Sequence, residues 1–167
     1  KARFFALIHG FIVFDSGTKK VPRHNQYFGV RAAQKRVQQR EGGAHPEGGI
    51  IWHTQGSGKS LTMVWLAKWI REHVSDARVL IITDRTELDE QIEKVFKEVD
   101  EQIYRTQSGP DLIGTLNQTT PWLLCSLVHK FGRGADDDDE TAADEFIADI
   151  QRNLPGDFQA KGNLFVF

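Results

Sequence analysis

The chain has 167 residues, 40% of them hydrophobic and 26% charged, and its formal net charge is −2 at pH 7. This length and globular composition fit one domain with a hydrophobic core and exclude a complete two-domain motor. Its single cysteine, Cys125, excludes an internal disulfide, and its six histidines include no pair at the spacing of a zinc site. The near-neutral charge neither requires nor excludes a nucleic-acid partner.

The first 22 residues predict either a core segment or a connector from an upstream domain. Residues 3–8 are apolar without a clean period, and residues 11–14 are strand-like before the turn signal Asp15-Ser16-Gly17. The apolar stretch 4–14 is too short to span a bilayer and lacks the small-residue cleavage signature of a signal peptide. We therefore expect a cytoplasmic protein with no membrane span.

A helix is predicted over residues 27–40, where Val30, Ala33 and Val37 share one face. Residues 41–49 contain four glycines and Pro46, which predicts a loop. The apolar run of residues 50–52 follows, and we expect it to be a buried strand that leads into the next motif.

Residues 53–61 have the composition of a phosphate-binding loop, and their candidate nucleotide ligands are Thr54, Gln55, Gly56, Ser57, Gly58, Lys59, Ser60 and Leu61. Glycines let consecutive N–H groups turn toward a phosphate, and the N-terminus of the following helix adds partial positive charge. The catalytic candidate, Lys59, would reach the β and γ phosphates, and Ser60 would bind Mg²⁺. His53 stands where the full pattern requires glycine, so a glycine-containing turn before a helix is the competing interpretation.

The rest of the chain alternates between helical patterns and apolar runs. We expect helices at residues 61–75, 86–99, 112–116 and 141–154, and buried strands at 79–82, 122–127 and 164–167. The acidic run 136–140 predicts a solvated loop. The alternation predicts an α/β fold, a mostly parallel sheet flanked by helices. Ligands of such sheets collect where the strands end, so the phosphate loop, residues 83–85 and residues 126–131 should converge.

Several stretches together resemble the R (motor and restriction) subunit of bacterial type I restriction-modification enzymes, a helicase-like ATPase of superfamily 2. In both their order along the chain and their amino-acid sequences, these stretches resemble motifs of that family. They are residues 23–28, 53–60, 83–92, 124–131 and 163–167. Members of superfamily 2 commonly keep only the G-x-G-K-[ST] half of the phosphate loop, which accounts for His53. The resemblance implies a P-loop NTPase, with residues 23–167 as the first RecA-like helicase domain and residues 1–22 as the connector from a nuclease domain.

The resemblance also implies roles for individual residues. Gln26 stands where the family's glutamine hydrogen-bonds the adenine of ATP, and residues 56–60 would hold Mg·ATP. Thr83, Asp84 and Arg85, with Ser126 and Lys130, would lie near a track for double-stranded DNA; ordinary turns at the ends of strands are the competing interpretation. The partners implied are methylase and specificity subunits, the second of which chooses the DNA site. The full subunit would hydrolyse ATP to move along DNA and would then cut it.

Some expected motifs of that family have no counterpart in the chain. No acidic motif for Mg²⁺ and water activation follows residues 164–167, so we expect this chain to bind ATP and to hydrolyse it poorly. The strand that would separate residues 50–52 from residues 164–167 is also lacking, which predicts a gap in a partial RecA-like sheet. Two alternatives remain: a small phosphotransferase, or a non-catalytic nucleotide-binding module.

Overall fold

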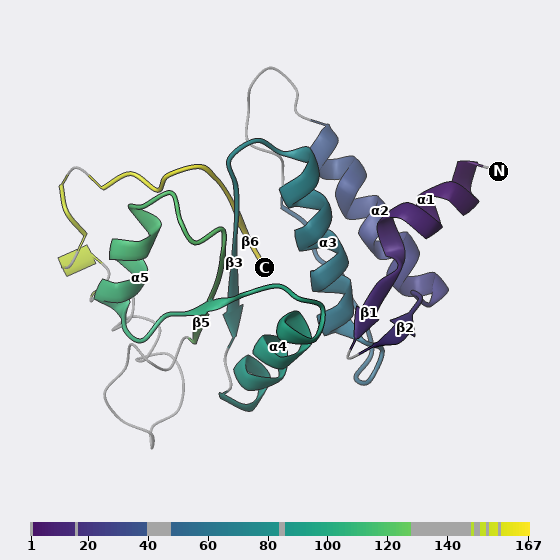
Figure 1. The fold of residues 1–167 in the computed structure, drawn as a ribbon. Helices are drawn as coiled ribbons and strands as arrows, with labels where there is room; N and C mark the ends of the chain where they lie inside the picture. Colours follow the sequence, from purple (N-terminus) through teal and green to yellow (C-terminus); the bar gives the residue numbers. More distant parts are fainter. Residues whose placement is uncertain are drawn as a thin grey trace. The chain divides into compact units, whose positions relative to one another are not determined.

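The computed structural model describes residues 2–15, 17–39, 48–83, 86–127, 148, 151–152, 154–156 and 158–167. The chain divides into two compact units. The N-terminal unit is Lys1–His73 with Glu98–Asp100, and the sheet unit is Val74–Lys97 with Glu101–Phe167. Each unit has its own arrangement of elements (Figure 1).

The N-terminal unit consists of a short hairpin and three helices. Helix α1 spans Ala2–Phe11, strands β1 (Val13–Asp15) and β2 (Thr18–Lys20) pair antiparallel, α2 spans His24–Gln38 and α3 spans Lys59–His73. Gly17, in the turn of the hairpin, has φ +79°, a conformation that glycine adopts without strain. The predicted strand at 11–14 is confirmed for its second half. The prediction left α1 unassigned because its apolar residues have no clean period.

Helix α3 forms the centre of this unit because it is apolar on more than one side. Its buried residues are Thr62, Val64, Trp65, Leu66, Ala67, Trp69 and Ile70. The Phe11 ring lies 6.2 Å from the Trp65 ring and 4.8 Å from the Tyr27 ring, which joins the end of α1 to both long helices. Helices α2 and α3 pack together, as Figure 1 shows. The expected helices 27–40 and 61–75 are thus confirmed, with shifted ends.

The sheet unit contains a four-stranded parallel sheet in the order β4-β5-β3-β6. Its strands are β3 (Ala77–Thr83), β4 (Tyr104–Arg105), β5 (Leu123–Leu127) and β6 (Asn163–Val166). Parallel pairing sets Leu80 beside Leu124 and Thr83 beside Leu127. Helices α4 (Thr86–Glu98) and α5 (Gly109–Leu116) flank the sheet. The predicted α/β class with a parallel sheet is confirmed.

Helix α5 is attached to the sheet by leucines and by a buried arginine. Leu112 and Leu116 pack against Leu80 and Leu124 of the central strands. Arg78 of β3 is 2% exposed, and its guanidinium donates to the backbone carbonyls of Thr115, Leu116, Gln118, Pro121 and Lys161. Burial lowers the pKa of Arg78 because desolvation disfavours its charged form. The carbonyls at the end of α5 compensate this cost, since they carry the negative end of the helix dipole.

Two strand predictions need correction. Residues 50–52 form no strand, and Ile50 and Trp52 are each 90% exposed. An extended segment is a stable strand only when a neighbour pairs with its backbone, and none of the described strands pairs with this one. Strand β6 exists but is only partly buried, with Val166 55% exposed. It pairs with β3 alone, so it is an edge strand of the described sheet.

Several predictions fall outside the described residues. They are the acidic run 136–140, most of the helix predicted at 141–154, and the end of the motif at 128–131. Within 141–154, the described residues 148, 151 and 152 are helical. None of the described helices is long and apolar enough to cross a membrane.

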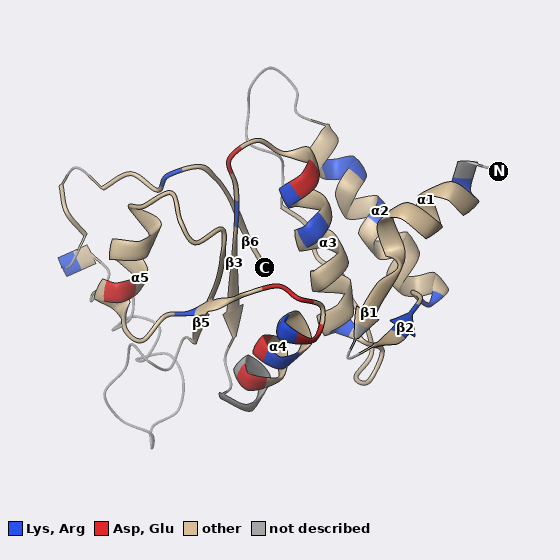
Figure 2. Ribbon diagram, viewed as in Figure 1, with Lys and Arg blue, Asp and Glu red and all other residues tan. Residues whose placement is uncertain are grey.

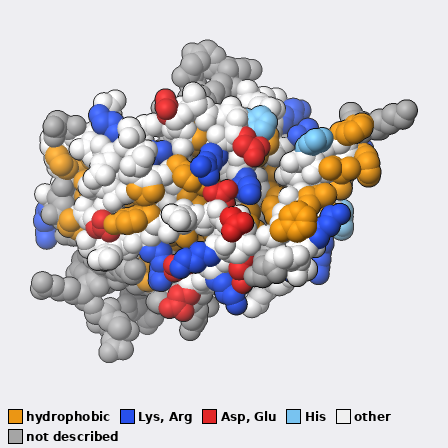
Figure 3. Space-filling model, viewed as in Figure 1, with side chains coloured by type: hydrophobic (Ala, Val, Ile, Leu, Met, Phe, Trp, Pro, Cys, Tyr) orange, Lys and Arg blue, Asp and Glu red, His pale blue; other side chains and the backbone are white. Residues whose placement is uncertain are grey.

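Hydrophobic side chains are exposed on the N-terminal unit. Phe4, Phe5 and Ile8 of α1 and Phe14 of β1 are between 39% and 63% exposed. Figure 3 shows hydrophobic side chains on the surface over α1. Charges of both signs instead follow one another along α4 in the sheet unit (Figure 2).

Candidate functional site

The phosphate loop lies between the exposed residues 50–52 and the first turn of α3. Gly56 and Gly58 have φ +73° and +81°, so both glycines of the motif adopt the left-handed conformation for which they were singled out. The Ser57 N–H donates to the Thr54 carbonyl at 3.3 Å, which closes the turn. The loop leads directly into Lys59, the first residue of the 15-residue helix α3. The predicted helix after the loop is therefore present, whereas the expected strand before it is not.

The Lys59 side chain contacts the backbone of its own loop. Its Nζ is 3.4 Å from the His53 carbonyl oxygen and 3.5 Å from the Thr54 carbonyl oxygen, and the lysine is exposed. Both contacts are long and involve neutral acceptors, so moving the ammonium to a phosphate would exchange weak hydrogen bonds for charge-assisted ones. The geometry suits an anionic ligand at the N-terminus of α3.

Gln26, in the first turn of α2, also contacts the loop. Its Nε2 donates to the carbonyls of Ser57 at 3.1 Å and Gly58 at 3.0 Å, and its Oε1 accepts from the Arg23 N–H at 2.7 Å. The residue is 4% exposed. Sequence reasoning selected Gln26 for adenine and missed this contact, because the bonded residues lie 31 and 32 positions apart with no local signal that links them.

Two buried polar atoms of the loop have no hydrogen-bond partner among the described residues: the Nδ1 of His53 and the Oγ of Ser57. Ser57 is 9% exposed. A buried hydroxyl without a partner costs free energy unless a ligand supplies one. The His53 ring faces Gly29 of α2, where a Cβ would lie 3.5 Å from its Nε2. The residue that departs from the full motif therefore packs between the loop and α2.

These residues fit a magnesium nucleotide. The loop offers glycine backbone amides, a lysine that hydrogen-bonds to two carbonyls, a helix N-terminus and a buried hydroxyl that no described residue pairs with. Ser60, in the first turn of α3, is half-buried. Within the described ranges no group of three or more His, Cys, Asp and Glu side chains could hold a metal. Ser60 could hold a Mg²⁺ ion together with phosphate oxygens, because its hydroxyl is an oxygen ligand of the kind that Mg²⁺ binds.

Thr62 also supports the loop, although sequence reasoning did not select it. Its N–H and its Oγ1 both approach the Gly58 carbonyl, at 3.3 Å and 3.4 Å. A threonine three positions after the motif lysine, inside the first turn of a helix, is the signal that could have identified it.

The DNA candidates lie in the sheet unit, where strands β3 and β5 end. Thr83 and Ser126 are 4% and 3% exposed. The Ser126 hydroxyl accepts a hydrogen bond from Thr106 at 2.9 Å, whereas the Thr83 hydroxyl has no partner among the described residues. Asp84, Arg85 and Lys130 lie outside the described residues. A role in DNA binding for these five residues, and the convergence of this edge with the phosphate loop, stay predictions.

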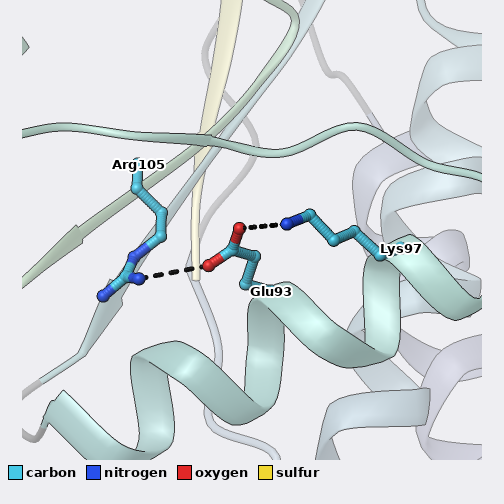
Figure 4. A network of polar contacts seen from close by, with 3 residues as sticks. All are labelled: Glu93, Lys97 and Arg105. Carbon is cyan, nitrogen blue, oxygen red and sulfur yellow. Dashed lines mark hydrogen bonds and ion pairs between the residues drawn. The ribbon is translucent and has the colours of Figure 1, made fainter.

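A second polar cluster in the sheet unit is structural. Glu93 of α4 accepts from Lys97, 2.6 Å away, and from Arg105 of β4, 3.1 Å away (Figure 4). The hydrogen bond from Lys97, with a smaller contribution from Arg105, lowers the pKa of Glu93 against an opposing effect of burial. The cluster ties α4 to the outer strand of the sheet and leaves Glu93 ionised at neutral pH.

Comparison with known proteins relates the chain to ATPases. The family model of the SWI2/SNF2 ATPase matches residues 25–163. A protein of Methanocaldococcus jannaschii named as the endonuclease subunit of type I restriction enzyme MjaIXP is 31% identical over 83% of this chain and 14% of its own length. The HindI endonuclease subunit of Haemophilus influenzae is 30% identical over 64% of this chain and 10% of its own. The chain thus spans about a tenth of the length of these relatives.

Proposed function

Because the chain belongs to the SWI2/SNF2 ATPase family, we propose that its phosphate loop binds Mg·ATP as the ATP-binding part of the R subunit of a type I restriction enzyme. The observation that carries the proposal is the loop itself. It has two left-handed glycines and, at the start of α3, a lysine that hydrogen-bonds to two backbone carbonyls. It also has the buried Ser57 hydroxyl, which has no partner in the part of the chain that the structure describes. The similarity to endonuclease subunits of type I enzymes supports the choice of R subunit.

Each loop residue has a separate task in this proposal. The backbone amides at Gly56, Ser57 and Gly58 surround the β phosphate, as in other phosphate loops. Lys59 swings from the His53 and Thr54 carbonyls to the β and γ phosphates. Ser60 would hold Mg²⁺, and the bound ion would neutralise phosphate charge. The rest of the phosphate site would be lined by Thr54, Gln55 and Leu61.

The proposal extends to the larger assembly through the relatives. In the complete R subunit, ATP hydrolysis would drive translocation on double-stranded DNA and lead to cleavage, together with methylase and specificity subunits. Such an enzyme would act on DNA in the cytoplasm. Residues 1–22 would connect to the nuclease domain, and residues 23–167 would form part of the first RecA-like domain.

Calorimetric titration with Mg·ATP tests the proposal, with phosphate release followed in the same samples with and without duplex DNA. Lys59→Ala should weaken Mg·ATP binding about tenfold or more, because it removes a charge-assisted contact to phosphate. Lys35→Ala removes the same charge from an exposed position on α2 and should leave the affinity unchanged.

We expect phosphate release to be slow in all samples. Binding that survives Lys59→Ala unchanged would contradict the phosphate site. Fast phosphate release without DNA would instead favour the small phosphotransferase.

A further inference from the structure

The side-chain amide of Gln26 is fully engaged within the protein. Both N–H groups of its Nε2 are used, on the carbonyls of Ser57 and Gly58, and its oxygen accepts from the Arg23 N–H. A primary amide carries two donors, so none is left for a base. In this conformation Gln26 binds the phosphate loop and has no donor for adenine.

The two carbonyls that Gln26 binds belong to consecutive peptide groups. The peptide with the Ser57 carbonyl carries the Gly58 N–H, and the peptide with the Gly58 carbonyl carries the Lys59 N–H. A trans peptide directs its N–H opposite to its C=O. Since both carbonyls face Gln26, both N–H groups must face away from it, toward the side where a phosphate would bind at the N-terminus of α3.

Contacts on both sides of the amide keep this arrangement in place. The Arg23 N–H fixes the orientation of Oε1, which leaves Nε2 directed at the loop. A Cβ built on Gly58 would collide with Gln26 Nε2, so the glycine is required both for its φ of +81° and for the close approach of the amide. Thr62 donates to the same Gly58 carbonyl from the helix side.

We propose that Gln26 is a positioning residue for phosphate binding: by holding the Ser57 and Gly58 carbonyls, it orients the Gly58 and Lys59 amides toward the phosphates of the nucleotide. This inference rests on the proposed function, because it concerns the same site. It differs from a role in base recognition in one measurable respect. A residue that orients backbone amides affects every ligand with phosphates, including one without a base.

Gln26→Glu separates the two roles, because it keeps the oxygen that accepts from Arg23 and replaces the donor with an acceptor that repels both carbonyls. Binding of Mg·ATP, Mg·GTP and magnesium tripolyphosphate is measured by calorimetry for the wild type and the variant. We expect all three affinities to fall by the same factor, about tenfold or more, since two donors are lost and two acceptors are opposed.

Gln34→Glu is the matched control. Gln34 is also a buried glutamine of α2, 2% exposed, but its Oε1 accepts from Arg31 and it has no bond to the loop. The control carries the same chemical change in the same helix and should leave all three affinities unchanged.

A spectroscopic readout distinguishes positioning from a general loss of structure. In ligand-free Gln26→Glu, the amide resonances of Gly58 and Lys59 should shift, while the indole resonance of Trp65, buried in the core of the same unit, stays in place. If Gln26→Glu does not fold, Arg23→Pro serves instead. It removes the N–H that orients Gln26, and the Arg23 φ of −68° suits proline. It should weaken all three ligands equally.

The outcomes are distinct. Loss of ATP affinity with unchanged tripolyphosphate binding would overturn the inference and assign Gln26 to the adenine. Unchanged affinity for all three ligands would overturn it as well. If the folded wild type binds neither ATP nor tripolyphosphate, the proposed function itself fails. If wild-type binding depends on Lys59 but not on Gln26, only this inference fails.

Discussion

The Nη1 of Arg78 lies 2.9 Å from the carbonyl oxygen of Leu116, the last residue of α5. This bond belongs to a set in which one buried guanidinium serves five carbonyls of loops and a helix end. A planar group with five N–H donors can satisfy several acceptors that a sheet and a helix leave unpaired. Arg78 therefore holds α5 and its following loop on β3.

Arg78→Met should lower the free energy of unfolding by about 2–4 kcal/mol, because it leaves several buried carbonyls without a donor. Arg78→Lys should cost less, since an ammonium keeps the charge and part of the hydrogen bonding. Urea denaturation measures both. Arg3→Met, at an exposed position on α1, is the control and should change stability by less than about 0.5 kcal/mol. Equal stability of Arg78→Met and wild type would contradict this account of α5.

Replacing either of two glycines of the sheet unit by alanine should change the stability of the chain, but with opposite signs. Gly162, just before β6, has φ +79°, and a Cβ there would lie 2.5 Å from the Asp76 carbonyl oxygen. Gly162→Ala should therefore destabilise the chain by about 1–3 kcal/mol. Gly114 lies in α5, and a Cβ at this position would have open space around it, so Gly114→Ala should stabilise the chain by up to about 1 kcal/mol. Thermal unfolding followed by circular dichroism gives both signs, and a stabilising Gly162→Ala would contradict the pairing of β6 with β3.

The Glu93 cluster predicts a pH-dependent contribution to stability. The pKa of Glu93 is lowered in the folded chain, chiefly by the hydrogen bond from Lys97. Its contribution is therefore present above the unfolded pKa, which is about 4.3, and is lost as the pH falls through the lower folded pKa. Glu93→Gln should cost about 0.5 kcal/mol at pH 7 and nothing at a pH below both values.

Urea titrations at a series of pH values measure this difference. Glu90→Gln, at an exposed position of the same helix, serves as the control. A Glu93→Gln cost that stays constant down to acidic pH would show that the ion pairs do not stabilise the fold.

The elements that sequence predicted well are those with strong local signals. Helix α4 has a capping pattern and an apolar period, and β3 and β5 are continuous apolar runs, as strands covered on both faces are. The helix expected at residues 112–116 is present as α5, but it begins three residues earlier, after Ser108, whose hydroxyl accepts from the Asp111 N–H. The glycine conformations of the phosphate loop also followed from local chemistry.

The elements that sequence missed depend on distant partners. Residues 50–52 are as apolar as a strand, but strand formation depends on pairing, which the residues themselves do not encode. Strand β4 has two residues and exists only through its pairing with β5. The contact of Gln26 with the loop joins elements separated by a long segment, and the five carbonyls around Arg78 come from loops and a helix end that only the tertiary fold brings together.

ATP binding at the phosphate loop is tested most directly by locating the nucleotide on the chain. A ¹⁵N-labelled sample is titrated with Mg·ATP up to roughly millimolar concentration, the upper range of enzyme affinities for their substrates, and the amide resonances are followed. ATP binding at the phosphate loop should give saturable shifts at Gly56, Gly58, Lys59 and Ser60, with no change in α5. Saturable shifts confined to other residues, or none at all in a folded chain, would contradict the assignment of this loop as the ATP site.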